Sequence, residues 1–248
     1  MTHRHSRRLL YILLFLCMIA LISVRVQPNV KPLDTFLEEL QASLGKAESI
    51  IDYDREGASV YALISKKGPL ESGEFFVAFR QKENEKWERF YENDFTTRKP
   101  WKIEVSDIDG DGVKEILTAV NKTTHFDQTE KNRMFIFNFD DEKLYKKWTG
   151  SQIAGIWKDF FVGDLVSIPG EELIFIEQTA DGKEKISIYY WFDFGFFLLA
   201  SSGSYQDIQN VTILGENRIQ ITEKEKHKQK AIILTIQYGE LVEPNQGF

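Results

Sequence analysis

The chain has 248 residues, of which 42% are hydrophobic and 28% are charged, a composition that excludes a largely disordered, collagen-like or disulfide-rich protein. The formal net charge of −7 and the single cysteine argue against a nucleic-acid-binding surface, an intramolecular disulfide and any multi-cysteine metal site. The length allows one large domain or two small ones with a sizeable core.

The N-terminal segment predicts a membrane anchor. A basic tail over residues 1–8 precedes an apolar run over residues 9–24. The run is shorter than a usual membrane span, but Arg8 and Arg25 can extend it by placing their charges in the interface. Three arginines precede the run and one follows closely, so the positive-inside rule predicts a cytoplasmic N-terminus and an extracytoplasmic C-terminal domain. We expect a cytoplasmic tail and then a single-pass transmembrane signal anchor over residues 9–26.

Two other fates of this segment stay open, and both also export the body. Cleavage as a signal peptide needs small residues, and Ile22-Ser-Val-Arg25 has no A-x-A pattern. Lipidation at Cys17 needs a small residue before the cysteine, where the sequence has Leu14-Phe-Leu16. Without residues 1–25 the formal charge of the body is −11, because four arginines and no acidic residue are removed. Such a surface suits divalent cations better than phosphates or anionic lipid.

A linker and a short amphipathic helix are predicted over residues 27–56. Prolines mark the linker, and Thr35 with Glu38 has the spacing of a capping box. Apolar residues then recur at helical intervals until Gly45, a plausible C-terminal stop. We expect a juxtamembrane helix over about residues 35–44, with an apolar stripe that packs either on the domain or on a partner helix.

Residues 57–248 are predicted to form an all-β domain. Short runs rich in Val, Ile, Phe, Tyr and Trp alternate there with clusters of Gly, Asp, Asn and Lys. Helical periodicity over ten residues is missing, which disfavours a parallel sheet with crossover helices.

The sequence also contains an internal repeat with an offset of 57 residues. Residues 105–117 align with residues 162–174, so that Asp107 coincides with Asp164 and Glu115 with Glu172. In each copy a second apolar strand and a charged hairpin tip follow. Chance alignment of two strand-turn-strand segments is the alternative explanation.

Two weaker copies complete the pattern, one at about residues 58–92 and one from Val211 onward. The four units average about 46 residues, the size of a four-stranded propeller blade, and the chain is too short for six or seven of them. We therefore predict a four-bladed or incomplete β-propeller-like domain, preceded by the transmembrane helix and the juxtamembrane helix.

The most informative stretch is an acidic loop at residues 107–115. Asp107, Asp109 and Asp111 occupy positions 1, 3 and 5, and alternate residues of a tight turn face inward. Two glycines permit the positive φ angles of such a turn. Hard oxygen ligands in this arrangement suit Ca²⁺, with the carbonyl of Val113 at position 7.

An EF-hand does not fit this loop, because Thr118 stands at position 12 and the flanks are predicted strands. Glu115 at position 9 supplies the closing carboxylate instead. The D-x-D-G-D-G-x-x-E-[IL] pattern between strands resembles the FG-GAP/VCBS repeat, the calcium-binding blade loop of integrin-α-like β-propellers. The resemblance implies calcium ligation by the side chains of Asp107, Asp109, Asp111 and Glu115 and by the carbonyl of Val113. In the second copy, Val166 and Ile168 replace the middle carboxylates, so we expect no metal there.

No G-x-S-x-G, H-E-x-x-H or phosphate-binding glycine loop occurs in the sequence. The densest aromatic stretch, Tyr189–Phe197, is expected to bury one face and expose the other. Core packing explains this stretch, and a sugar- or peptide-stacking platform or an exposed interface patch is the alternative. We expect a non-catalytic, membrane-anchored extracytoplasmic binding or scaffold module with a structural Ca²⁺, an envelope protein or glycan as partner, and no nucleic acid. The alternative is an extracytoplasmic carbohydrate-binding or carbohydrate-active protein that uses the aromatic strand and the acidic loops.

Overall fold

The computed structural model describes residues 33–68, 70–83, 86–149, 153, 155–226 and 228–244. The predicted cytoplasmic tail (residues 1–8) and signal anchor (residues 9–26) lie outside these residues. Within the described part of the chain, no helix combines the length and the apolar character needed to cross a membrane. The predicted short helix is present as α2, Leu33–Ala42, and begins two residues earlier than expected.

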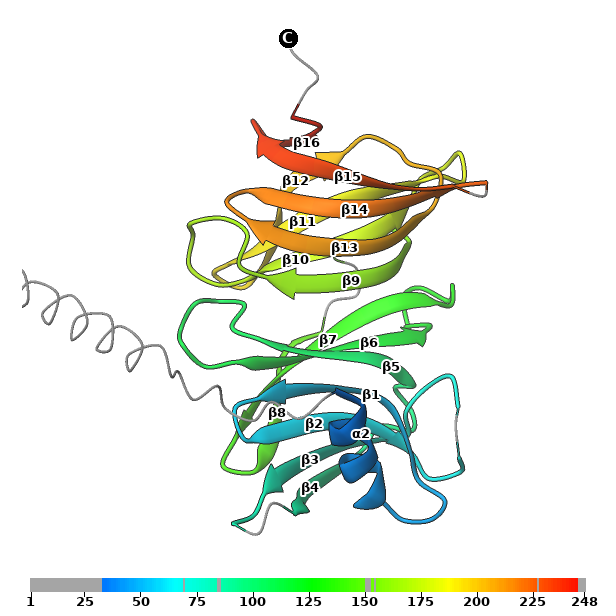
Figure 1. Cartoon of the computed structure of the whole chain (residues 1–248), viewed down its shortest axis with the longest axis vertical. Coiled ribbons are helices and arrows are strands. Elements are labelled where there is room, and N and C mark those ends of the chain that lie inside the picture. The colour runs from blue at the N-terminus through cyan, green and yellow to red at the C-terminus, as the bar shows by residue number, and fades with distance from the viewer. Residues whose placement is uncertain are drawn as a thin grey trace, which may run out of the picture. The chain divides into compact units, whose positions relative to one another are not determined.

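The rest of the described chain is built from strands, which confirms the all-β class (Figure 1). The strands follow one another as four antiparallel meanders of four strands each. The first comprises β1 (Ser49–Glu56), β2 (Ser59–Ser65), β3 (Phe75–Gln81) and β4 (Trp87–Asp94). The second comprises β5 (Pro100–Ser106), β6 (Glu115–Lys122), β7 (Lys131–Asp140) and β8 (Lys143–Thr149). The third comprises β9 (Trp157–Gly163), β10 (Glu172–Gln178), β11 (Glu184–Phe192) and β12 (Gly195–Ser202). The fourth comprises β13 (Ile208–Gly215), β14 (Arg218–Glu225), β15 (Lys228–Gln237) and β16 (Glu240–Val242).

The first two meanders are separate sheets, whereas the third and fourth join into one sheet of eight strands. The join is a short parallel pairing of β12 with β16, in which Ser201 lies opposite Glu240 and Ser202 opposite Leu241. The second and third meanders begin 57 residues apart, at Pro100 and Trp157, which is the offset of the sequence repeat.

The core lies on the inner strands of the meanders. β6 and β10 are buried along almost their whole length, which explains their continuous apolar sequences. One cluster of buried side chains joins the second and third meanders, and includes Ile108, Leu117, Trp157 and Phe175. The second and third meanders therefore share a core, and the two repeat copies lie within it.

β1 begins at Ser49, earlier than residue 57, the predicted start of the all-β domain. The prediction was wrong here because the acidic residues of β1 are more typical of a linker than of a strand. In the structure the carboxylates of Asp52 and Asp54 accept hydrogen bonds from the backbone N–H groups of Ile103 (2.8 Å) and Val105 (2.6 Å) on β5. Burial raises the pKa of both carboxyl groups. The polar pattern of β1 therefore reflects a side-chain junction between the first two sheets.

Candidate metal centre

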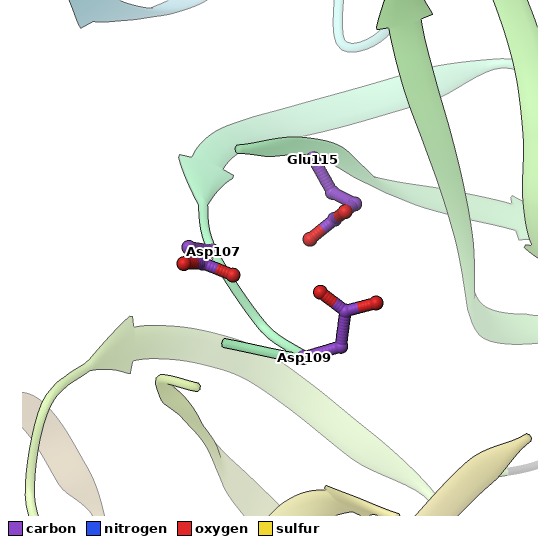
Figure 2. Close-up of side chains that lie close together, drawn as sticks. All are labelled: Asp107, Asp109 and Glu115. Carbon is purple, nitrogen blue, oxygen red and sulfur yellow. The ribbon is translucent and has the colours of Figure 1, made fainter. Parts of the chain in front are cut away.

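The acidic loop connects β5 to β6, and its glycines adopt the expected left-handed conformation, with φ angles of 73° at Gly110 and 86° at Gly112. The loop brings three of the five predicted ligands together. Carboxylate oxygens of Asp107, Asp109 and Glu115 all lie within 4.8 Å of one another. Figure 2 shows the three side chains pointing toward a common centre from the loop and the start of β6.

The other acidic residue of the loop makes a local contact. The Asp111 carboxylate accepts a hydrogen bond of 2.7 Å from the N–H of Val113, and Asp111 is not part of the converging group. Asp107 both joins the group and braces the loop, because its two oxygens accept hydrogen bonds from Gly110 (2.7 Å) and Gly112 (2.9 Å). Several carboxylate oxygens of the loop therefore accept hydrogen bonds from backbone N–H groups of the same loop.

Glu115 closes the loop from inside the protein. It is the first residue of β6 and only 1% exposed, and its Oε2 accepts a hydrogen bond of 3.1 Å from the N–H of Ile108. Burial raises the pKa of this carboxyl group, while its hydrogen bond with Lys147 opposes the rise. A cation beside Glu115 therefore favours the ionised form of this carboxyl group.

Lys147 on β8 supplies such a cation. Its ammonium donates a hydrogen bond of 2.6 Å to Glu115 Oε1 and a second, short one to Asp109 Oδ2. The side chain is 12% exposed, and the ammonium lies 5.6 Å from the ring centre of Trp191. Burial lowers the pKa of Lys147, but the bonds to Asp109 and Glu115 prevail and raise it. Sequence reasoning missed this residue because nothing local distinguishes it from the neighbouring Lys146.

The donor chemistry of the centre fits a divalent cation of the calcium type. Three carboxylates face one ammonium, so the formal charge of the cluster is −2, and all the converging side-chain ligands are hard oxygens. The ammonium holds two of the three carboxylates. A divalent cation that uses Asp109 and Glu115 together must therefore displace Lys147 from them.

The second repeat copy forms the loop between β9 and β10 and reproduces one bond of the first. Glu172 Oε2 accepts hydrogen bonds from the N–H groups of Leu165 (2.8 Å) and Val166 (3.3 Å). The bond to Leu165 matches the bond between Glu115 and Ile108, 57 residues earlier. The ninth-position glutamate thus holds the second residue of its own loop in both copies.

The two loops pack directly on each other. The N–H of Glu171 donates to the carbonyl of Asp107 (2.8 Å), and the Ser106 hydroxyl donates to the Glu171 carboxylate. A Cβ atom added at Gly110 would lie 2.6 Å from the backbone nitrogen of Gly170, closer than atoms can approach. The degenerate copy therefore serves as a surface against which the acidic loop is held.

Among the described residues, Glu172 has no cationic partner that corresponds to Lys147 beside Glu115. It is fully buried, and its Oε1 has no hydrogen-bond partner within the described residues. Burial raises its pKa to about 7, against the lowering effect of the bonds from Leu165 and Val166. Because the folded-state pKa exceeds the unfolded value, this group stabilises the fold at low pH, and that stability is lost as the pH rises through 7.

Glu172→Gln is expected to flatten this pH dependence. A rise in pKa from 4.5 to about 7 corresponds to about 3 kcal/mol. The wild type should lose most of that stability between pH 5 and pH 8, and the variant should not. Urea unfolding at both pH values measures the difference. The exposed Glu216→Gln is the control, and parallel curves for Glu172→Gln and the wild type would contradict the prediction.

The aromatic stretch forms the end of the β11–β12 hairpin and buries one face, as expected. Trp191 and Phe196 are opposite each other across the two strands, and Phe196 contacts Trp148 edge-on at 5.4 Å. Phe192 and Phe197 lie on the other face with large exposed areas. The ring of Trp191 is therefore engaged with its neighbours inside the protein, while phenylalanines form the outer surface.

The chain matches no family model and no curated protein. Among solved structures it is similar to a Bacteroides uniformis protein with the provisional name 6-phosphogluconolactonase, at 11% identity and a TM-score of 0.40, over 78% of this chain and 69% of that one. It is also similar to a Xanthomonas protein related to the type IV secretion system, at 14% identity and a TM-score of 0.32, over 82% of this chain and 96% of that one. Likeness at this level assigns neither fold nor activity.

Proposed function

We propose that the chain is a non-catalytic, membrane-anchored extracytoplasmic binding or scaffold module whose acidic loop takes one structural Ca²⁺. The convergence of Asp107, Asp109 and Glu115 carries this proposal. Their oxygens are bonded to loop amides and to Lys147, which supports a bracing role rather than contact with a substrate. The charge asymmetry around the apolar run of residues 9–24 supports anchoring and export.

We further propose that the four meanders are the blades of an irregular or incomplete propeller related to the FG-GAP/VCBS repeat. The four consecutive four-stranded units and the equivalence of Glu115 and Glu172 support this interpretation. The fusion of the third and fourth meanders through β12 and β16 departs from a ring of separate blades. Calcium in the acidic loop would then fasten the β5–β6 turn at the place where it meets the next unit.

A thermal melt of the full chain in detergent tests the calcium proposal. With a Kd of about 0.1 mM, Ca²⁺ at about 2 mM should stabilise the protein by about 1.8 kcal/mol relative to EDTA. At this size that corresponds to a rise in Tm of about 4–7 °C. Asp109→Ala should abolish the shift, whereas Asp181→Ala at the exposed β10–β11 turn should retain it. Equal shifts in the wild type and Asp109→Ala would contradict the proposal.

Glycan binding is the second candidate function, and a polar depression lined mainly by the second meander, with residues of the first and third, favours it. The depression has a volume of about 530 Å³, and its lining includes Trp101, Asn121 and Glu130. The indole N–H of Trp101 is buried and has no acceptor among the described residues. An indole beside amide and carboxylate groups offers the stacking and hydrogen bonding that sugars require.

A glycan array separates this candidate from the first. Binding should be lost in Glu130→Gln, because this variant removes a charged contact without emptying the site. Trp191→Ala should leave glycan binding unchanged, since that ring lies on the β11–β12 hairpin. Binding that is insensitive to Glu130→Gln, or no binding by the wild type, would dismiss the candidate.

A further inference from the structure

The end of the β11–β12 hairpin presents an apolar surface of defined shape. Tyr190 is paired with Phe197 and Phe192 with Gly195, so only Asp193 and Phe194 form the turn, and Asp193 has a φ angle of 57°. We call residues 190–198 the aromatic hairpin. On its inner face, the ring of Phe196 contacts both Trp148 and Trp191 edge-on.

The outer face of the aromatic hairpin is a continuous group of exposed apolar side chains. Phe194 at the tip is 76% exposed and Phe192 is 58% exposed. Phe192 and Phe197 meet edge-on at 5.7 Å, and Tyr190 lies 6.2 Å from Phe197. Leu198, opposite Tyr189, is also exposed, but on the face of the hairpin that carries Trp191. Exposed apolar groups of this kind mark a contact with another apolar phase or partner.

The composition of the aromatic hairpin indicates whether it contacts a sugar or a lipid. Between residues 186 and 199 the only charged side chain is that of Asp193. No side-chain amide lies in this segment, and the outer rings are mainly phenylalanines. A sugar would find stacking surfaces without hydrogen-bonding partners, whereas a lipid interface accommodates aromatic rings and aliphatic side chains directly.

The length of the preceding chain determines which lipid surface is near. Eight residues, 25–32, separate the predicted anchor run from the start of α2, and a fully extended segment of that length spans at most about 29 Å. The ten residues of α2 add about 15 Å, so the β domain begins within about 44 Å of the end of that run. Its formal charge of −11 gives no attraction to anionic lipid, so a neutral apolar contact is the available means of docking.

We propose that the aromatic hairpin inserts its tip into the outer leaflet of the membrane that anchors the chain. This inference rests on the anchored topology of the proposed function. Insertion is shallow, because the Asp193 carboxylate stays in the hydrated headgroup layer. The outer edge of β12 also has no strand partner from Gly195 to Ala200 within the described residues, and unpaired peptide groups are costly in hydrocarbon. The hairpin thus fixes the orientation of the domain on the membrane.

Depth-dependent fluorescence quenching on the full chain in phosphatidylcholine vesicles tests this. Cys17 is the only cysteine, so Cys17→Ser allows single labelling with an environment-sensitive nitrobenzoxadiazole at Phe194→Cys or Phe192→Cys. Phe126→Cys and Tyr238→Cys, at fully exposed apolar positions outside the hairpin, are the matched controls. The labels on the hairpin should shift to the blue and be quenched at least about twofold more by acyl-chain spin labels than the controls.

Flotation of the same vesicles tests the membrane anchor separately from the insertion of the hairpin. A chain that floats but carries hydrated labels at residues 192 and 194 overturns the insertion alone. A chain that does not float overturns the anchor and the insertion with it. Labels that shift to the blue without quenching by acyl-chain spin labels show that protein, such as a second copy paired along β12, covers the hairpin instead of lipid.

Discussion

Replacing Lys147 with methionine is expected to lower the free energy of unfolding in EDTA by about 3 kcal/mol. The ammonium is the shared partner of Asp109 and Glu115, so its loss leaves a buried carboxylate without a counter-charge. Methionine keeps much of the length of the side chain and its contact with Trp191, so the change reports charge more than packing. Urea unfolding in EDTA measures it, with Lys146→Met on the exposed side of β8 as the control.

Calcium should partly reverse this loss. The ammonium and the metal use the same oxygens, and removing Lys147 makes the cluster more negative, so Lys147→Met should bind Ca²⁺ at least about tenfold more tightly than the wild type. Isothermal titration of both proteins measures the ratio. Equal affinities would show that the ammonium does not compete, whereas the absence of binding by both proteins would contradict the calcium proposal itself.

Alanine at Gly170 is expected to destabilise the fold by about 3 kcal/mol or more. Gly170 has a φ angle of 88°, and its added Cβ would overlap the carbonyl oxygen of Ile108 and lie 2.7 Å from the carbonyl carbon. Both obstacles are backbone atoms, so no side-chain rotation relieves the clash. The acidic loop would have to move away from its neighbour, and the adjacent bond from Glu171 to Asp107 would be lost with it.

Gly112→Ala is the matched control for this prediction. Gly112 has a similar φ angle of 86°, but a Cβ atom there meets nothing within 4 Å. It should cost only the strain of the left-handed conformation, about 1–2 kcal/mol. Urea unfolding of the two variants isolates the effect of loop packing. If Gly170→Ala costs no more than Gly112→Ala, the two loops are not in contact in solution.

The sequence alone predicted the features that depend on neighbouring residues. Alternation and turn residues indicated the strands and the hairpin tips, and the observed turn at Asp141 and Glu142 has the positive φ angles of a tight hairpin. The repeat offset of 57 residues matches the spacing of β5 and β9. The acidic loop was also identified locally, because its ligands lie within nine residues. The anchor, the calcium and the family resemblance stay predictions.

Only the tertiary structure decided which groups meet across the units. Lys147 reaches Glu115 from 32 residues away, and Glu171 reaches the Ser106 hydroxyl from 65 residues away. Asp52 likewise became part of a junction because β5 presents a free N–H opposite it. A sequence pattern records only the period of burial along one strand, whereas these contacts depend on how separate strands pack. The position of the acidic loop was therefore encoded locally, but the charge that balances it was set by the fold.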